Sequence, residues 1–209
     1  MNVSSSKHRR PACAALLGAA LALAGCASTQ LDAQWSDPQL GGNHYLSGAR
    51  VMVACDTFEL VLRQICQDQL AADIASRGGS PVFPPASVAI ATDRSVDAQL
   101  LPAAREAGAK AVMVMTLAAA VSDVSPGVSI GLGGFGFGRH SGVGVGLGVP
   151  IGGGRVTTGY TANTRLTDVQ SGRLVWTAKA TAPPSSDVNA QIGELSRSVL
   201  GAADKTGLF

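Results

Sequence analysis

The sequence is poor in charge, in histidine and in long apolar runs, and these shortages limit what the protein can be. Only 14% of the 209 residues are charged, and only three are histidines. The longest apolar stretch, from Ala12 to Leu23, is about a dozen residues, whereas a helix needs roughly 20 apolar residues to cross a bilayer. We therefore expect no permanent transmembrane helix and a surface with few charges.

The first residues have the three zones of a secretory signal peptide. The basic residues 7–10 come first, the apolar stretch follows, and LAGC at residues 23–26 ends the segment. LAGC resembles the lipobox of bacterial lipoproteins, in which the cysteine is acylated and becomes the first residue of the mature chain. This predicts a signal peptide over residues 1–25 and lipidation at Cys26; the alternative is a secreted protein with a chance cysteine. Ala27, where an Asp would favour the inner membrane, indicates the periplasmic face of the outer membrane.

Removal of the signal peptide changes the charge balance. Without Lys7, Arg9 and Arg10, the 16 basic residues fall to 13, against 14 acidic ones. No basic patch remains that would favour nucleic acid as a partner. The excess of positive charge belongs to the targeting segment.

Two cysteines remain beside Cys26, since Cys13 lies in the predicted signal peptide. Cys55 falls on one face of a predicted strand and Cys66 on the apolar stripe of the following helix. Because the periplasm is oxidising, a disulfide between them is the expected state. Two buried free thiols are the alternative. A metal site is not expected, since no histidine or second cysteine pair is near.

The hydrophobic pattern predicts a tether over residues 26–48 and a single domain over 49–209. We expect an α/β (α+β) fold: a mixed sheet with about three helices, in the order β-α-β-α-β, Gly-rich hairpin, β-β-α. The predicted strands are 51–54, 81–83, 111–117, 156–168 and 173–181, and the predicted helices are 58–77, 97–107 and one capped by Ser185 or Ser186. Phe58 is assigned to the apolar face of the first helix, and Pro183-Pro184 is expected to end the last strand.

Residues 127–153 alternate apolar side chains with glycine, which predicts a hairpin with one apolar face. Its partner-binding candidates are Phe135, Phe137, Val145 and Leu147. The first hypothesis is a non-enzymatic module that binds an envelope protein through this hairpin and the adjoining sheet edge. Because each arm is about as long as a membrane-spanning strand, the second hypothesis is a homo-oligomeric pore or secretion-channel subunit.

Catalytic and cofactor motifs are weak. Residues 131–136 match G-x-G-x-x-G, but no helix follows, so neither a nucleotide nor another cofactor is expected. His44 and His140 are predicted in loops without an orienting acid. Asp168 is interpreted as a turn residue and Trp176 as a core residue. We therefore predict no catalytic residue, and a hydrolase that uses His140 is the third alternative.

Three segments resemble a family of small proteobacterial envelope lipoproteins. They are QWSDP at 34–38, REAGAKAVMV at 105–114 and LTDVQSGRLVW at 166–176. The resemblance implies the α/β domain found in small periplasmic lipoproteins, similar to the curli secretion channel subunit and to the N-terminal domain of the propeller protein of the Tol system. The motifs are structural, so the resemblance implies no activity.

Overall fold

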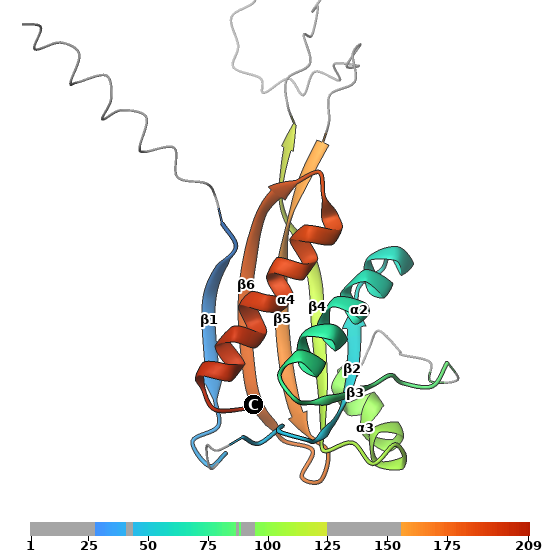
Figure 1. Cartoon of the computed structure of the whole chain (residues 1–209). Helices are drawn as coiled ribbons and strands as arrows, with labels where there is room; N and C mark the ends of the chain where they lie inside the picture. The colour runs from blue at the N-terminus through green and yellow to red at the C-terminus, as the bar shows by residue number, and fades with distance from the viewer. Residues whose placement is uncertain (1–27, 41–43, 87, 89–94, 125–155) are drawn as a thin grey trace, which may run out of the picture.

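Six strands and three helices make up the part of the chain that the structure, a computed structural model, describes: residues 28–40, 44–86, 88, 95–124 and 156–209. The strands form one mixed sheet in the order β1-β6-β5-β4-β2-β3 (Figure 1). The predicted α/β class is confirmed. The elements, in chain order, are β1 (Gln30–Ser36), β2 (Arg50–Asp56), α2 (Leu60–Ser76), β3 (Ser80–Val82), α3 (Val96–Glu106), β4 (Ala111–Val124), β5 (Val156–Asp168), β6 (Leu174–Ser185) and α4 (Val188–Lys205).

The sheet combines two kinds of connection. Strands β2, β3 and β4 are parallel to one another, so α2 and α3 must carry the chain back between them. Strands β4, β5 and β6 form an antiparallel meander, and β1 pairs antiparallel with β6. Among the described helices, none is long and apolar enough to span a membrane.

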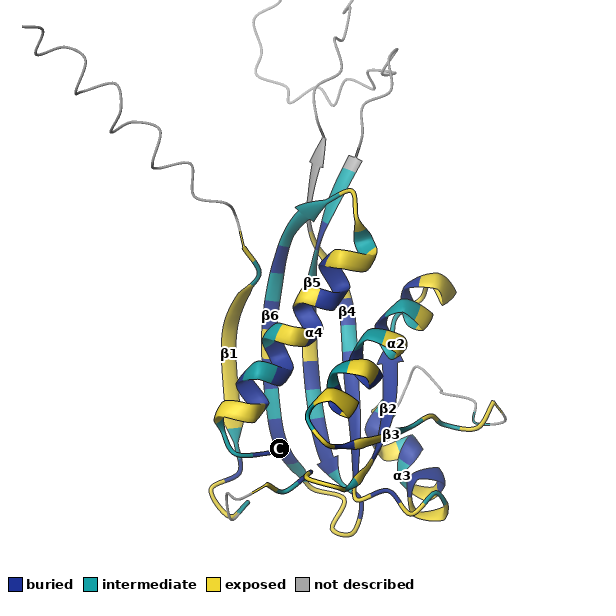
Figure 2. Cartoon of the chain, viewed as in Figure 1, coloured by how far each residue is buried: buried dark blue, intermediate teal, exposed yellow. Residues whose placement is uncertain are grey.

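Helices cover both faces of the sheet around β2 and β4. Helices α2 and α4 pack on one face over the larger core, which contains Met113, Leu166 and Trp176, all 0% exposed. Helix α3 packs on the other face over Met52 and Val112. Figure 2 shows the buried residues gathered between these layers. The continuous apolar run of β4 follows from this arrangement, because both of its faces are covered.

Residues 30–36, which lie within the predicted tether over 26–48, form the edge strand β1. Its backbone pairs with β6 from Gln30 to Ser36, with a bulge after Leu31. Its first six residues are exposed, so no apolar alternation marked the strand in the sequence. Farther along, Leu46 is fully buried in the core. These residues form a strand because they pair with β6, about 150 residues farther along the chain, and not because of their local sequence.

The start of α2 differs from the prediction as well. The helix begins at Leu60 after Glu59, which makes no capping bond through its side chain. Phe58 lies before the helix and is 97% exposed, so its assignment to the apolar face is wrong. The rest of the predicted apolar face of this helix is confirmed, since Cys66, Leu70 and Ile74 are fully buried.

Strand β6 runs through Pro183-Pro184 to Ser185, which corrects the predicted stop. Pairing with β1 has already ended at Thr181, and the register with β5 shifts between the pairs at Ala182 and Ser185. Proline, which lacks an N–H, is tolerated in a strand at such unpaired and irregular positions. The following helix is capped by the Asp187 carboxylate, which accepts a hydrogen bond from the Ala190 N–H, and not by either serine.

Candidate functional site

Strands β4 and β5 project beyond β2 as an arm, along which β6 stays beside β5 as far as the pair Thr158↔Ser185. They pair from Ala111↔Asp168 to Val124↔Val156, with one register irregularity between Ala119 and Val121. Strand β2 stops at the pair Asp56↔Thr116, so within the described residues β4 has only β5 beside it from there on. The arm leads directly into residues 125–155. The predicted hairpin residues Phe135, Phe137, Val145 and Leu147 lie outside the described residues.

Gly159 allows β6 to come close to β5 beside the arm. A Cβ atom at this position would lie 2.9 Å from the Ala182 carbonyl oxygen, closer than side chains approach. The backbone of β6 therefore comes this near to β5 only because residue 159 has no side chain. This close approach coincides with the register shift before Ser185.

The N-terminal end of β1 lies at the same end of the sheet as the arm (Figure 1). Gln30 pairs with Thr181, Thr181 with Thr161, and Thr161 with Ala118 near the base of the arm. Cys26, which is not among the described residues, precedes Gln30 by four residues. The predicted lipidation position and the Gly-rich segment therefore leave the sheet from one end.

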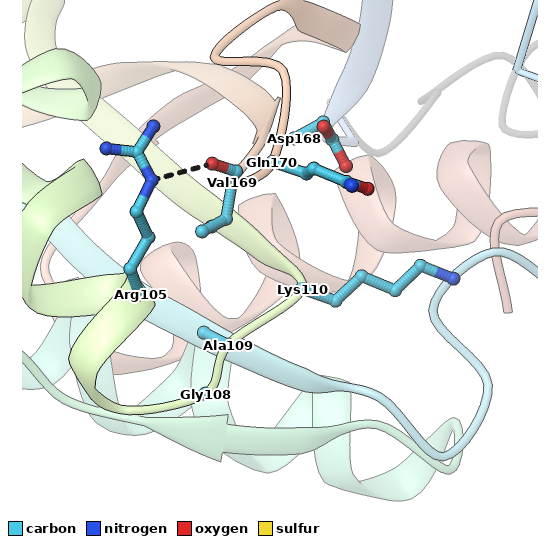
Figure 3. A pocket seen from close by; sticks show the side chains of 7 residues that line it. All are labelled: Arg105, Gly108, Ala109, Lys110, Asp168, Val169 and Gln170. Atoms are coloured by element: carbon cyan, nitrogen blue, oxygen red, sulfur yellow. Dashed lines mark hydrogen bonds between the residues drawn. The ribbon is translucent and has the colours of Figure 1, made fainter.

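A shallow hollow of about 480 Å³ lies at the opposite end, where β5 turns into β6 (Figure 3). Lys110 places its ammonium 4.2 Å from the centre of the Tyr45 ring, a cation–π contact. Arg105 donates its Nε–H to the Val169 carbonyl at 3.2 Å. The hollow is lined by Arg105, Gly108, Ala109, Lys110, Asp168, Val169 and Gln170.

Asp168 is already occupied by hydrogen bonds. It accepts bonds from the Ser171 N–H and hydroxyl at 2.6 Å and from the Tyr45 hydroxyl at 2.5 Å. Burial acts to raise the pKa of Asp168, but these hydrogen bonds outweigh it and lower the pKa below its ordinary value. Burial, and then the bond to Asp168, raise the pKa of Tyr45. At neutral pH Asp168 is therefore a carboxylate and Tyr45 a neutral phenol. Asp168 closes the turn to Ser171, as its interpretation as a turn residue predicts.

One buried carboxylate was missed by the sequence analysis. Asp97 in the first turn of α3 is buried and accepts bonds from Arg165 at 3.0 Å and from Thr167 at 2.8 Å. These contacts join α3 to β5 across the sheet. The bonds from Arg165 and Thr167 to Asp97 have a structural role. No sequence motif marks these three residues, because Asp97 lies about 70 residues from the other two.

The other predicted site residues are dispersed. The sulfur atoms of Cys55, near the end of β2, and Cys66, on α2, are bonded to each other, with Cα atoms 6.1 Å apart. His44 is exposed and its ring contacts the Phe209 carbonyl, while His140 and residues 131–136 lie outside the described ranges. Within residues 28–40, 44–86, 88, 95–124 and 156–209, no three His, Cys, Asp or Glu side chains lie together as metal ligands would.

Comparison with known proteins extends to the fold alone. Neither a family model nor a curated protein matches the sequence. The chain is similar to the PelC dodecamer from Paraburkholderia phytofirmans, with a TM-score of 0.50 and 16% identity over 82% of this chain and 95% of that one. Weaker similarities are to lipoprotein GNA1162 from Neisseria meningitidis (TM-score 0.41, 14% identity, 75% of this chain and 99% of that one) and to TolB from Acinetobacter baumannii (0.38, 12%, 85% and 31%).

Proposed function

We propose that this protein is a lipid-anchored envelope module that self-associates and binds an envelope partner, without catalysing a reaction itself. The lipobox at residues 23–26 supports the anchor at Cys26. Ala27 supports the periplasmic face of the outer membrane as its location. The shared end of the sheet, from which both the anchor and the arm leave, carries the proposal.

The reach of the anchor matches the height of the arm. Four residues link Cys26 to Gln30 and span at most about 14 Å when fully extended. On the arm, β5 extends five residues from Thr161, which is in the row of Gln30, to Val156, or about 17 Å at roughly 3.3 Å per residue. Acyl chains on Cys26 would therefore hold the end of the arm at the membrane surface, and the hollow at Lys110 would face the periplasm.

This orientation gives the Gly-rich segment a role. Residues 127–153 leave the sheet at Val124 and return at Val156, so they would meet lipid or a membrane-bound partner first. Their apolar candidates, Phe135, Phe137, Val145 and Leu147, suit such an apolar surface better than open water. The poverty of charged residues in the chain fits a protein held against other envelope components.

A second candidate is a pore or secretion-channel subunit, and the similarity to PelC favours it. PelC is a dodecamer, and a ring of copies of this chain would gather many arms at one membrane surface. A single arm cannot enclose a channel, so this candidate requires the ring. The two candidates share the anchor and the orientation and differ in whether the segment crosses the membrane.

Anchoring is tested with Cys26→Ser. We expect wild-type protein to incorporate labelled palmitate and to sediment with outer membranes, and the variant to lose both properties. Palmitate labelling that survives the substitution would contradict the assignment of Cys26.

The two candidates are separated by deleting residues 127–153. The shortened protein should keep its melting temperature and lose crosslinking to its envelope partner; unchanged crosslinking would contradict the binding role. Dye leakage from vesicles that wild-type protein causes, and the shortened protein does not, would favour the channel. Light scattering of the lipidated protein in mild detergent gives the assembly state, and a monomer would contradict self-association.

A further inference from the structure

Large apolar side chains are exposed on two opposite flanks of the described chain. The β1 flank carries Leu31 and Trp35, which are 41% and 47% exposed. The α2 flank carries four more, namely Phe58, Leu60, Val61 and Phe83, with exposed fractions from 50% to 97%. Figure 2 shows β1 and α2 on opposite sides of the sheet, with exposed residues along β1 and at the start of α2. Leu31 pairs with Ala180, which belongs to the larger core, and Trp35 pairs with Thr177, so the two side chains project from opposite faces of β1. Isolated exposed apolar residues are ordinary, but these lie along the two outer edges of the described sheet.

The same two flanks have strand edges whose backbone N–H and C=O groups pair with no other described strand. Strand β1 is one edge of the sheet and pairs only with β6. Strand β3 is the other edge, and its three residues pair only with residues 50–52 of β2, so the described chain leaves the outer side of residues 53–56 unpaired. Open edges of this kind are places where another chain adds.

Trp35 and Phe83 lie at nearly the same height on the two flanks. Trp35 shares a row with Ala54 through the pairs Trp35↔Thr177, Thr177↔Arg165, Arg165↔Val114 and Val114↔Ala54. Phe83 follows Val82, which pairs with Met52, so it lies about one row from Ala54. One row corresponds to roughly 3.3 Å along the strands.

Leu31 and Phe58 are matched in the same way. The row of Leu31 reaches Leu117 through the pairs Leu31↔Ala180, Ala180↔Ala162 and Ala162↔Leu117. Strand β2 ends one row lower, where Asp56 pairs with Thr116, and Phe58 is two residues farther on. Trp35 thus has Phe83 about one row away, and Leu31 has Phe58 near its row, in the bend that follows β2.

A hollow of about 330 Å³ lies beside Trp35, on a part of the sheet that no described helix covers. It is lined by Ala33, Gln34, Trp35, Asn163, Thr177, Ala178 and Lys179. Trp35 is the one aromatic side chain in this lining. An aromatic side chain at the height of Trp35 can enter it, and Phe83 of another copy is at that height.

From these observations we propose that copies of this chain associate head to tail, with the β1 flank of one copy packed against the α2 flank of the next. The inference rests on the proposed self-association and names the surfaces that produce it. The two flanks differ, so the contact is heterologous, and repeating it leads to a ring if the rotation between copies closes. Strands of successive copies stay level, so every anchor and every arm points to one side.

The test uses two variants of the full lipidated protein in mild detergent, and each carries glutamate substitutions in one of the two flanks. The first carries Leu31→Glu and Trp35→Glu, and the second carries Phe58→Glu and Phe83→Glu. The control is Gln170→Glu, which places a glutamate at an exposed turn outside both flanks. All four side chains of the flank variants are exposed, and circular dichroism melting verifies that each variant folds.

We expect each flank variant to be a monomer by light scattering, while the control keeps the mass of the wild-type assembly. An equal mixture of the two flank variants should form a dimer and nothing larger, because one intact β1 flank and one intact α2 flank remain. Flank variants that assemble as wild type does would overturn the inference and leave the proposed function standing. Dimers of either variant alone would overturn it too, since they require like flanks to pair. A monomeric wild-type protein would instead refute self-association.

Discussion

Reduction of the Cys55–Cys66 disulfide should lower the thermal stability of the protein by a predictable amount. The bond closes a loop with a sequence separation of 11 residues between β2 and α2. In the chain-entropy account, a loop of this size stabilises the folded state by about 3 kcal/mol through restriction of the unfolded chain. For a protein of 150–250 residues, about 1 kcal/mol corresponds to roughly 2–4 °C in melting temperature, so a fall of about 6–12 °C is expected.

The assay compares melting curves with and without a reducing agent in wild type and in the double variant Cys55→Ala with Cys66→Ala. Reduction should lower the melting temperature of wild type and leave that of the variant unchanged. Thiol titration of the reduced, lipidated protein should find two thiols per chain, because Cys26 is acylated. A wild-type melting temperature that stays constant while two thiols appear would refute the reasoning, since it would mean that the link restricts the unfolded chain very little.

Three further predictions concern single side chains. Trp176→Ala should cost about 3–5 kcal/mol in the free energy of unfolding, because it empties the space of a fully buried ring; a loss under about 1 kcal/mol in urea titration would contradict this. Asp187→Ala should cost about 1 kcal/mol through loss of the α4 cap, while Ser185→Ala should cost less; an equal effect of the two would mean that the cap is misassigned. Asp168→Asn should lower the melting temperature at pH 7. Because the folded protein lowers the pKa of Asp168 below 3.8, its contribution is complete above that value and is lost as the pH falls through the folded pKa, so the two melting temperatures should converge below about pH 4. A gap that stays constant down to pH 2 would contradict the role of the carboxylate.

The sequence predicts the elements that bury a periodic apolar pattern. Strand β5 has the predicted bounds, 156–168, and α2 begins two residues after its predicted start and ends one residue before its predicted end. Strand β4 was recognised because helices cover both of its faces and its buried part is uniformly apolar. In each case the pattern of apolar side chains reflects which faces of the element are covered.

Strand β1 was missed for the opposite reason. Its stability comes from backbone bonds to β6, and its exposed side chains leave no pattern. Pro183-Pro184 misled the prediction in a similar way, since the residues do not reveal that the ladder with β1 ends at Thr181. Both errors concern which strand lies beside which, and local sequence does not contain that information.

The two features that support the proposed function depend on the same long-range pairing. Cys26 is evident from the sequence, but that β1, which follows it, begins at the same end of the sheet as the β4–β5 arm is known only from three successive strand pairings. The matched heights of Trp35 and Phe83 require six strands in a known register. Composition indicates that the surface is poor in charge, and only the fold shows that its large apolar residues gather on two flanks.

The orientation at the membrane can be measured by energy transfer from a dye on the protein to labelled lipid headgroups. The dye is attached to Thr157→Cys on the arm or to Gln170→Cys at the opposite turn, in lipidated protein bound to vesicles. The strand separates these positions by about 40 Å at roughly 3.3 Å per residue. Our account predicts strong transfer from position 157 and weak transfer from position 170. Equal transfer from both positions, or stronger transfer from position 170, would contradict the claim that the anchor holds the arm at the membrane.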